Sequence, residues 1–134
     1  MLRGIISSLA RIGIKIDDYV WESGFLKSQE MDTVISSLSG SIQTEKEAQY
    51  IELKNGSKVF LRRADGTSLY TLRDLAYHTF KALNYDWLID VLGEDHKDYA
   101  KSLNEILTEK VDLRAMVSFV FYSYVSLDTG KMST

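Results

Sequence analysis

The sequence predicts an α+β fold with a helical majority, in which five to six helices pack on a β-hairpin or a three-stranded antiparallel meander. Apolar residues recur at helical spacing through most of the chain. The middle third changes to a strand-like pattern around an Asn-Gly pair, which is typical of a hairpin turn. With 134 residues, of which 45% are hydrophobic and 26% charged, the chain can bury a core and is expected to form a single domain.

The N-terminal part, residues 1–40, is predicted to be helical. Residues 1–16 contain Arg3, Arg11 and Lys15 but no acid, and their apolar positions form a helical stripe. We interpret this segment as a core helix, and a helix lying on an anionic membrane surface is the alternative. A helical phase continues after it, and the last helix of this part is expected to stop at Gly40.

Residues 48–70 are predicted to form the hairpin or meander. Asn55 and Gly56 separate two short apolar runs, and this pair supplies the positive φ angles of a type I′ turn. A second turn at Asp65-Gly66 precedes residues 68–70, which could add a third strand. Such a small sheet must lay one face on helices.

Residues 71–127 are predicted to be mainly helical. Thr71 and Asp74 have the spacing of a capping box, which places a helix start there. A short helix is expected over residues 87–92, ended by Gly93, and Asp95 is expected to cap the next helix. The core stripe of that next helix consists of Tyr99, Leu103, Ile106 and Leu107.

Residues 113–127 fit either a helix or a strand. Their length favours a helix, whereas their valines and aromatic residues favour a strand, and we adopt the helix. Such a helix would be apolar nearly all round, with Phe119, Tyr122 and Val125 on a second face that meets another subunit. Residues 128–134 are expected to be a frayed tail.

The composition excludes several functional classes. Without cysteine, the chain has no disulfide, thiolate metal site or cysteine nucleophile, and its two histidines are too few for a His-rich metal site. A net charge of −3 argues against binding to the DNA backbone. No phosphate-binding loop, dinucleotide fingerprint or metalloprotease signature is present, so neither cofactor nor metal is expected. Without a secretory signal or an apolar run long enough to span a bilayer, we expect a cytoplasmic protein.

Arg73 and His78 are the candidate catalytic residues. Their Arg-x4-His spacing resembles the motif of HEPN-type RNases, and this resemblance implies a dimeric site where Arg73 stabilises the scissile phosphate and His78 moves a proton. Residues 72–80 are also similar to the second helix of DinB-like bundles, whose histidine binds a metal. Because His96 is the only other histidine, a three-histidine site cannot be assembled in one chain.

Arg62, Arg63 and Arg73, together with His78, form a candidate anion-binding or partner-binding group, because guanidinium groups pair with phosphate and carboxylate. The absence of catalytic signatures leads us to expect a non-enzymatic protein-interaction or regulatory module. It would act through homo-oligomers and an unidentified protein partner, with no DNA. The alternatives are a HEPN-like RNase and a membrane-surface protein.

Overall fold

The computed structural model describes residues 2–25, 29–123, 126–127 and 130–131, and it confirms the predicted α+β class. The helices are α1 (Leu2–Arg11), α2 (Glu22–Phe25), α3 (Gln29–Ser37), α4 (Tyr70–Ala82), the 3-10 helix η1 (Glu94–His96) and α5 (Lys97–Glu109). The strands are β1 (Ile42–Glu45), β2 (Ala48–Glu52), β3 (Lys58–Arg62), β4 (Trp87–Gly93), β5 (Met116–Tyr122), β6 (Ser126–Leu127) and β7 (Gly130–Lys131).

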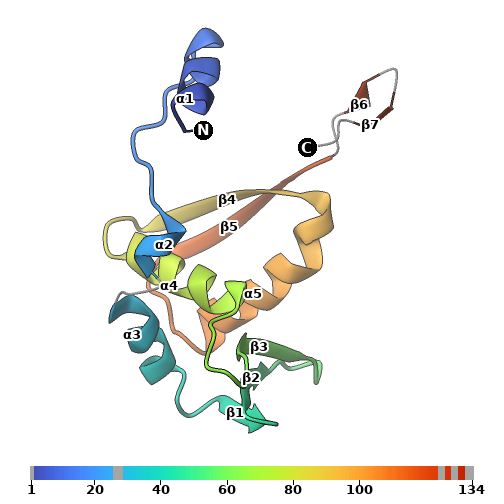
Figure 1. Ribbon diagram of the computed structural model, residues 1–134. Coiled ribbons are helices and arrows are strands. Elements are labelled where there is room, and N and C mark those ends of the chain that lie inside the picture. The colour runs from blue at the N-terminus through green and yellow to red at the C-terminus, as the bar shows by residue number, and fades with distance from the viewer. Residues whose placement is uncertain (1, 26–28, 124–125, 128–129, 132–134) are drawn as a thin grey trace.

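The body of the molecule has a helical layer between two small sheets (Figure 1). The antiparallel sheet β1–β2–β3 lies at one end, the parallel pair β4–β5 lies at the other, and α4 and α5 fill the space between them. The fully buried side chains at the centre come from both helices, from the antiparallel sheet and from the residue that follows α3: Leu72, Leu75, Ile106, Leu107, Ile51, Leu61 and Leu38.

The helix α1 forms as predicted, but it is not a core helix, because none of its residues is buried. It extends away from the body on the segment that leads to α2 (Figure 1). Its apolar stripe, which includes Ile5 and Ile6, is therefore exposed.

The predicted hairpin is confirmed, but its turn is not of type I′, because φ is positive at Gly56 and not at Asn55. Gly56 has a φ of 79°, and the Asn55 carboxamide accepts a hydrogen bond of 2.9 Å from the backbone N–H of Ser57. The meander differs from the prediction in its third strand, since β1 completes the sheet and residues 68–70 contribute only one bridge, from Ser68 to Arg62.

The turn between β1 and β2 has an unusual backbone. Lys46 and Glu47 adopt φ values of 47° and 66°. This left-handed conformation is one that residues with a Cβ adopt at a cost in free energy.

The helix α4 is confirmed, but it does not start with a capping box. It begins at Tyr70, its N-cap is Leu69, and no side chain caps it. Thr71 is a buried residue of the first turn instead. The predicted core stripe of α5 is confirmed, because Leu103, Ile106 and Leu107 are all buried.

The predictions of a helix at residues 87–92 and of another at residues 113–127 are wrong, because these segments contain the parallel strands β4 and β5. The pairing of the two strands runs from Trp87 opposite Met116 to Gly93 opposite Tyr122. The chain segment that connects β4 to β5 contains α5. Of the expected tail, residues 130–131 pair with residues 126–127, and the remainder lies outside the described residues.

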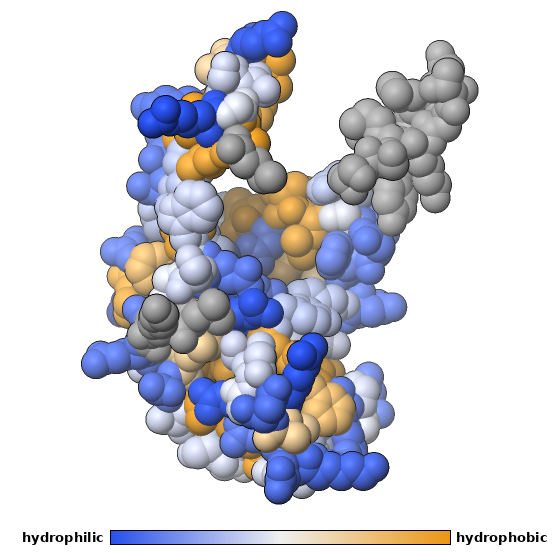
Figure 2. All heavy atoms as spheres, viewed as in Figure 1, coloured by the Kyte–Doolittle hydropathy of each residue, from blue (hydrophilic) through white to orange (hydrophobic). Residues whose placement is uncertain are grey.

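One face of the β4–β5 pair is uncovered in this chain. Its side chains are mostly large and apolar, and Figure 2 shows apolar surface in the recess beneath α1. Parallel strands in proteins are normally covered on both faces. The exposed residues of this outer face are Trp87, Ile89, Val91, Met116, Val120 and Tyr122.

Candidate functional site

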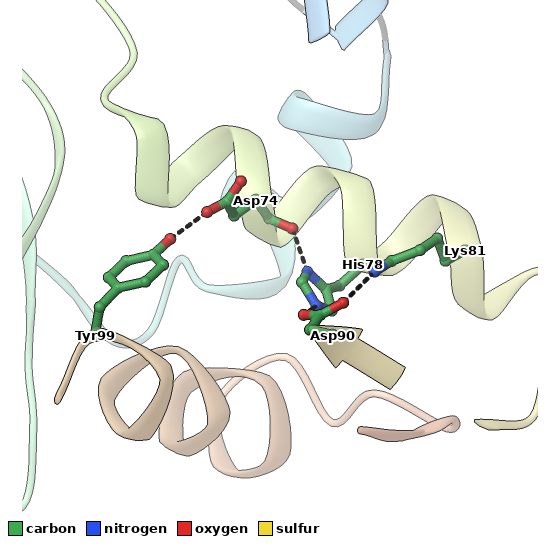
Figure 3. Close-up of polar contacts among 5 residues, drawn as sticks. All are labelled: Asp74, His78, Lys81, Asp90 and Tyr99. Carbon is green, nitrogen blue, oxygen red and sulfur yellow. Dashed lines mark hydrogen bonds and ion pairs between the residues drawn. The ribbon is translucent and has the colours of Figure 1, made fainter. Parts of the chain in front are cut away.

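A buried polar network joins α4 to β4 (Figure 3). Asp90 lies in the middle of β4 on the side that faces the helices. Its Oδ2 is 2.6 Å from Nε2 of His78, and its Oδ1 accepts a hydrogen bond of 2.8 Å from Nζ of Lys81. The side chains of His78 and Asp90 are only 5% and 16% exposed, so this charged group lies largely away from water.

His78 is fixed from two sides. Its Nδ1 lies 2.7 Å from the backbone carbonyl oxygen of Asp74, one helical turn earlier, while its Nε2 faces Asp90. The ring thus contacts both the turn that carries Asp74 and the strand β4. His78 is buried, and its carboxylate partner lies on a strand that was mistaken for a helix.

The ionisation of Asp90 is favoured despite its burial. Desolvation of the carboxyl group opposes ionisation, but the hydrogen bonds and positive charges of His78 and Lys81 outweigh it and lower the pKa of Asp90 to about 2. Asp90 is therefore a carboxylate at neutral pH.

Asp74 lines a small pocket beside this network. Its Oδ2 accepts a hydrogen bond from the hydroxyl of Tyr99 on α5 (Figure 3), and burial together with this carboxylate raises the pKa of Tyr99. The pocket has a volume of about 260 Å³ and aromatic walls. It is lined by Val20, Glu22, Phe25, Arg73, Asp74 and Tyr77.

Arg73 also lines this pocket, and its guanidinium group is already ion-paired. Its Nη1 lies 2.6 Å from a carboxylate oxygen of Glu22 on α2, which balances its charge. Its Nε is buried and has no hydrogen-bond partner among the described residues. The pocket thus combines the carboxylate of Asp74 with the ion-paired guanidinium group of Arg73.

The carboxyl ends of β4 and β5 form a second feature of the site. In open α/β sheets, ligands bind outside the carboxyl ends of the parallel strands. Here β4 ends at Gly93 and leads into η1, where hydrogen bonds from Lys97 and then Ser123 lower the pKa of Glu94. A Cβ on Gly93 would lie 2.5 Å from Oδ1 of Asp95, so the glycine leaves room for that carboxylate.

The predicted arginine cluster is not assembled as one ion-paired group in the described part of the chain. Arg62 lies 3.7 Å from Asp32 of α3, whereas Arg73 pairs with Glu22 of α2. Arg63 lies at the turn after β3, where its backbone N–H bonds Thr67. Arg73 and His78 likewise have separate partners.

The predicted interface residues also separate. Phe119 faces inward and packs against the core, whereas Tyr122 is exposed on the outer face of β5. Val125 lies outside the described residues. Alternation along a strand, and not the second face of a helix, therefore determines which of these residues are accessible.

Sequence reasoning missed Asp90, Lys81 and Tyr99 as site residues. An acid between Ile89 and Val91 in an apolar run is a signal that could have indicated a buried, paired carboxylate.

Among the described residues, no three His, Asp or Glu side chains are grouped to hold a metal ion. None of the helices in these residue ranges has the length and apolar composition needed to cross a bilayer.

Comparison with known proteins gives relatives over the whole chain. The arginine–tRNA ligase of Thermoplasma acidophilum is 54% identical over 134 residues, which cover 100% of this chain and 24% of that protein. The arginine–tRNA ligase of Methanobrevibacter smithii is 40% identical and covers 99% of this chain. The chain thus spans about a quarter of the length of these curated relatives. No family model matches it.

Solved structures show the same fold. A Campylobacter jejuni protein assigned as an arginyl-tRNA synthetase superimposes with a TM-score of 0.84 at 22% identity, over 99% of this chain and 31% of that one. Arginyl-tRNA synthetase from Plasmodium falciparum gives a TM-score of 0.78 at 19% identity, over 92% of this chain and 23% of that one.

These findings correct the functional expectation. The relatives are ligases, so a non-enzymatic interaction or regulatory module is wrong. The two alternatives, a HEPN-like RNase and a membrane-surface protein, are overturned by the same relatives. The Arg-x4-His resemblance covered six residues, whereas the similarity to the ligases covers the chain.

Proposed function

We propose that this chain is a segment of an arginine–tRNA ligase and takes part in joining arginine to tRNA. The observation that carries the proposal is the 54% identity to the Thermoplasma acidophilum ligase along all 134 residues. The shared fold with two solved synthetases supports it. The cytoplasm, expected from the sequence, is a compartment that suits such a ligase.

The pocket beside Asp74 fits the side chain of arginine. A guanidinium group is bound best by a carboxylate, often through two parallel hydrogen bonds, and it also stacks on aromatic rings. Asp74 offers the carboxylate, and Phe25 and Tyr77 supply aromatic walls.

The charge of residues 84–112 favours binding of the amino acid arginine over binding of tRNA. Residues 84–112 contain eight acids and only three lysines. A negative surface attracts the cationic amino acid and repels the phosphates of tRNA. We therefore expect the acidic residues 84–112 to favour the approach of arginine and to avoid the tRNA backbone, while the pocket beside Asp74 holds the side chain.

A chimeric enzyme tests the proposal. The chain replaces the matching 134-residue segment of the Thermoplasma acidophilum ligase, and attachment of arginine to tRNA is measured. We expect the chimera to charge tRNA with arginine. A chimera that folds, as judged by circular dichroism and a cooperative unfolding transition, but does not charge tRNA would contradict the proposal.

One variant of the chimera tests the pocket. Asp74→Asn removes the carboxylate charge and should raise KM for arginine by on the order of 10- to 100-fold, with kcat changed less, because a charged hydrogen bond contributes about 1.5–3 kcal/mol. The matched control is Asp98→Asn, since the Asp98 side chain is 96% exposed. Equal KM values in the two variants would refute the role of Asp74.

A further inference from the structure

The His78 ring lies between two oxygen acceptors. Nδ1 is 2.7 Å from the backbone carbonyl oxygen of Asp74, and Nε2 is 2.6 Å from Oδ2 of Asp90. A carbonyl oxygen only accepts, so Nδ1 carries a hydrogen. A neutral imidazole would then present a bare lone pair to the carboxylate at hydrogen-bond distance, which is repulsive.

The proton between His78 and Asp90 therefore belongs to the ring. The other oxygen of Asp90 accepts a hydrogen bond of 2.8 Å from the ammonium group of Lys81, which favours the ionised carboxylate. The charged and titratable groups around the ring are Asp90 from β4 and Lys81 and Tyr77 from α4. The Asp74 carboxylate, bonded to Tyr99 of α5, lies one turn away.

We propose that His78 is a positioning residue for arginine binding: as an imidazolium it binds Asp90 and the Asp74 carbonyl together, and so fixes the Asp74 turn of α4 against β4. This inference rests on the proposed function. It makes His78 distinct from a catalytic residue, because a ring only 5% exposed, with both nitrogens engaged, does not touch a substrate.

The arrangement predicts how substitutions differ. His78→Gln can donate to Asp90 or to the Asp74 carbonyl but cannot reproduce both contacts, so the turn that presents Asp74 is released. Asp90→Asn should preserve the geometry, because its amide oxygen can accept from Lys81 while its NH₂ group donates to the bare Nε2 of a neutral His78. Asp90→Asn thus removes the need for the second ring proton.

The first test measures the ring directly. The protein has only two histidines, so ¹⁵N-histidine labelling gives two rings, and His96→Gln assigns them. We expect both nitrogens of His78 to show imidazolium signals, because each lies at hydrogen-bond distance from an oxygen acceptor. In Asp90→Asn one nitrogen should show the signal of an unprotonated ring nitrogen. Such a signal from the unsubstituted protein would overturn the proposal.

The second test uses the ligase chimera and its KM for arginine. His78→Gln should raise KM about tenfold with a smaller change in kcat. Asp90→Asn should keep a low KM, because its amide can still bond both His78 and Lys81. Lys101→Gln, a change at an exposed residue, is the control.

The outcomes separate the two proposals. A folded but inactive chimera contradicts the ligase assignment, while the NMR signal still tests the imidazolium. An active chimera whose KM for arginine is unaffected by His78→Gln overturns the positioning role alone.

Discussion

The largely buried carboxylate of Asp90 should make the unfolding free energy of this protein depend on pH in the acid range. The Asp90 carboxyl has an ordinary pKa of 3.8, and its surroundings lower the pKa to about 2 in the folded chain. The folded protein therefore holds this proton more weakly than the unfolded chain does. The resulting stabilisation is present above pH 3.8 and is lost as the pH falls towards 2.

The separation between the two pKa values corresponds to about 2 kcal/mol of unfolding free energy. The side chain of Asp90 is 16% exposed, so solvent screening reduces this contribution only in part. Asp90→Asn cannot ionise and lacks the contribution at every pH. The difference in stability between the unsubstituted protein and this variant should shrink by about 2 kcal/mol between pH 5 and pH 2.

Urea denaturation, followed by circular dichroism at constant ionic strength, measures this difference. Asp98→Asn is the matched control, because its exposed side chain should leave the pH dependence unchanged. If Asp90→Asn and the unsubstituted protein lose stability in parallel between pH 5 and pH 2, the reasoning about the Asp90 network is refuted.

Three further predictions follow from the backbone and the sheet. Gly93→Ala should displace the exposed Asp95 carboxylate, 2.5 Å from the new Cβ, and shift the NMR signals of Asp95 with little change in the unfolding free energy, while Gly40→Ala, which has open space, shifts no carboxylate. Gly56→Ala should lower the unfolding free energy by about 1 kcal/mol in urea denaturation, because φ is 79° there; an unchanged midpoint would contradict this turn geometry. Val91→Lys, on the outer face of β4, should change the stability of this chain by less than about 0.5 kcal/mol but lower the melting temperature of the chimera, because parallel strands are normally covered on both faces and we expect the added chain to lie there. An equal change in melting temperature in the chain and in the chimera would refute the expectation that added chain lies on the outer face of β4.

The elements predicted correctly depend on local chemistry. The turn after β2 needs a positive φ at Gly56, which glycine adopts readily, and the stripe of α5 follows the helical period over 13 residues. The strands β4 and β5 were missed because each is a run of seven residues in which apolar side chains occupy both faces. A short apolar run of this kind has no period that separates a strand from a buried helix.

The site was less predictable than the fold. His78 stood out as one of two histidines, but its meaning depends on Asp90, which reaches it only through the tertiary packing of β4 on α4. Arg73 was identified for its spacing to His78, yet its contacts are with Glu22 and the pocket beside Asp74. Contacts between distant elements, rather than residue spacing, therefore define this site.

The turn at Lys46 and Glu47 is a place where a substitution could raise the unfolding free energy of the protein. Two consecutive residues with a Cβ hold left-handed angles there, at a cost of about 1 kcal/mol each, and an Asn-Gly pair would adopt the same angles more readily. This tip of the antiparallel sheet touches neither the Asp74 pocket nor the carboxyl ends of β4 and β5. Replacing Lys46 and Glu47 with Asn and Gly would give a more stable protein. Destabilising substitutions at the site could then be studied in that protein without unfolding it.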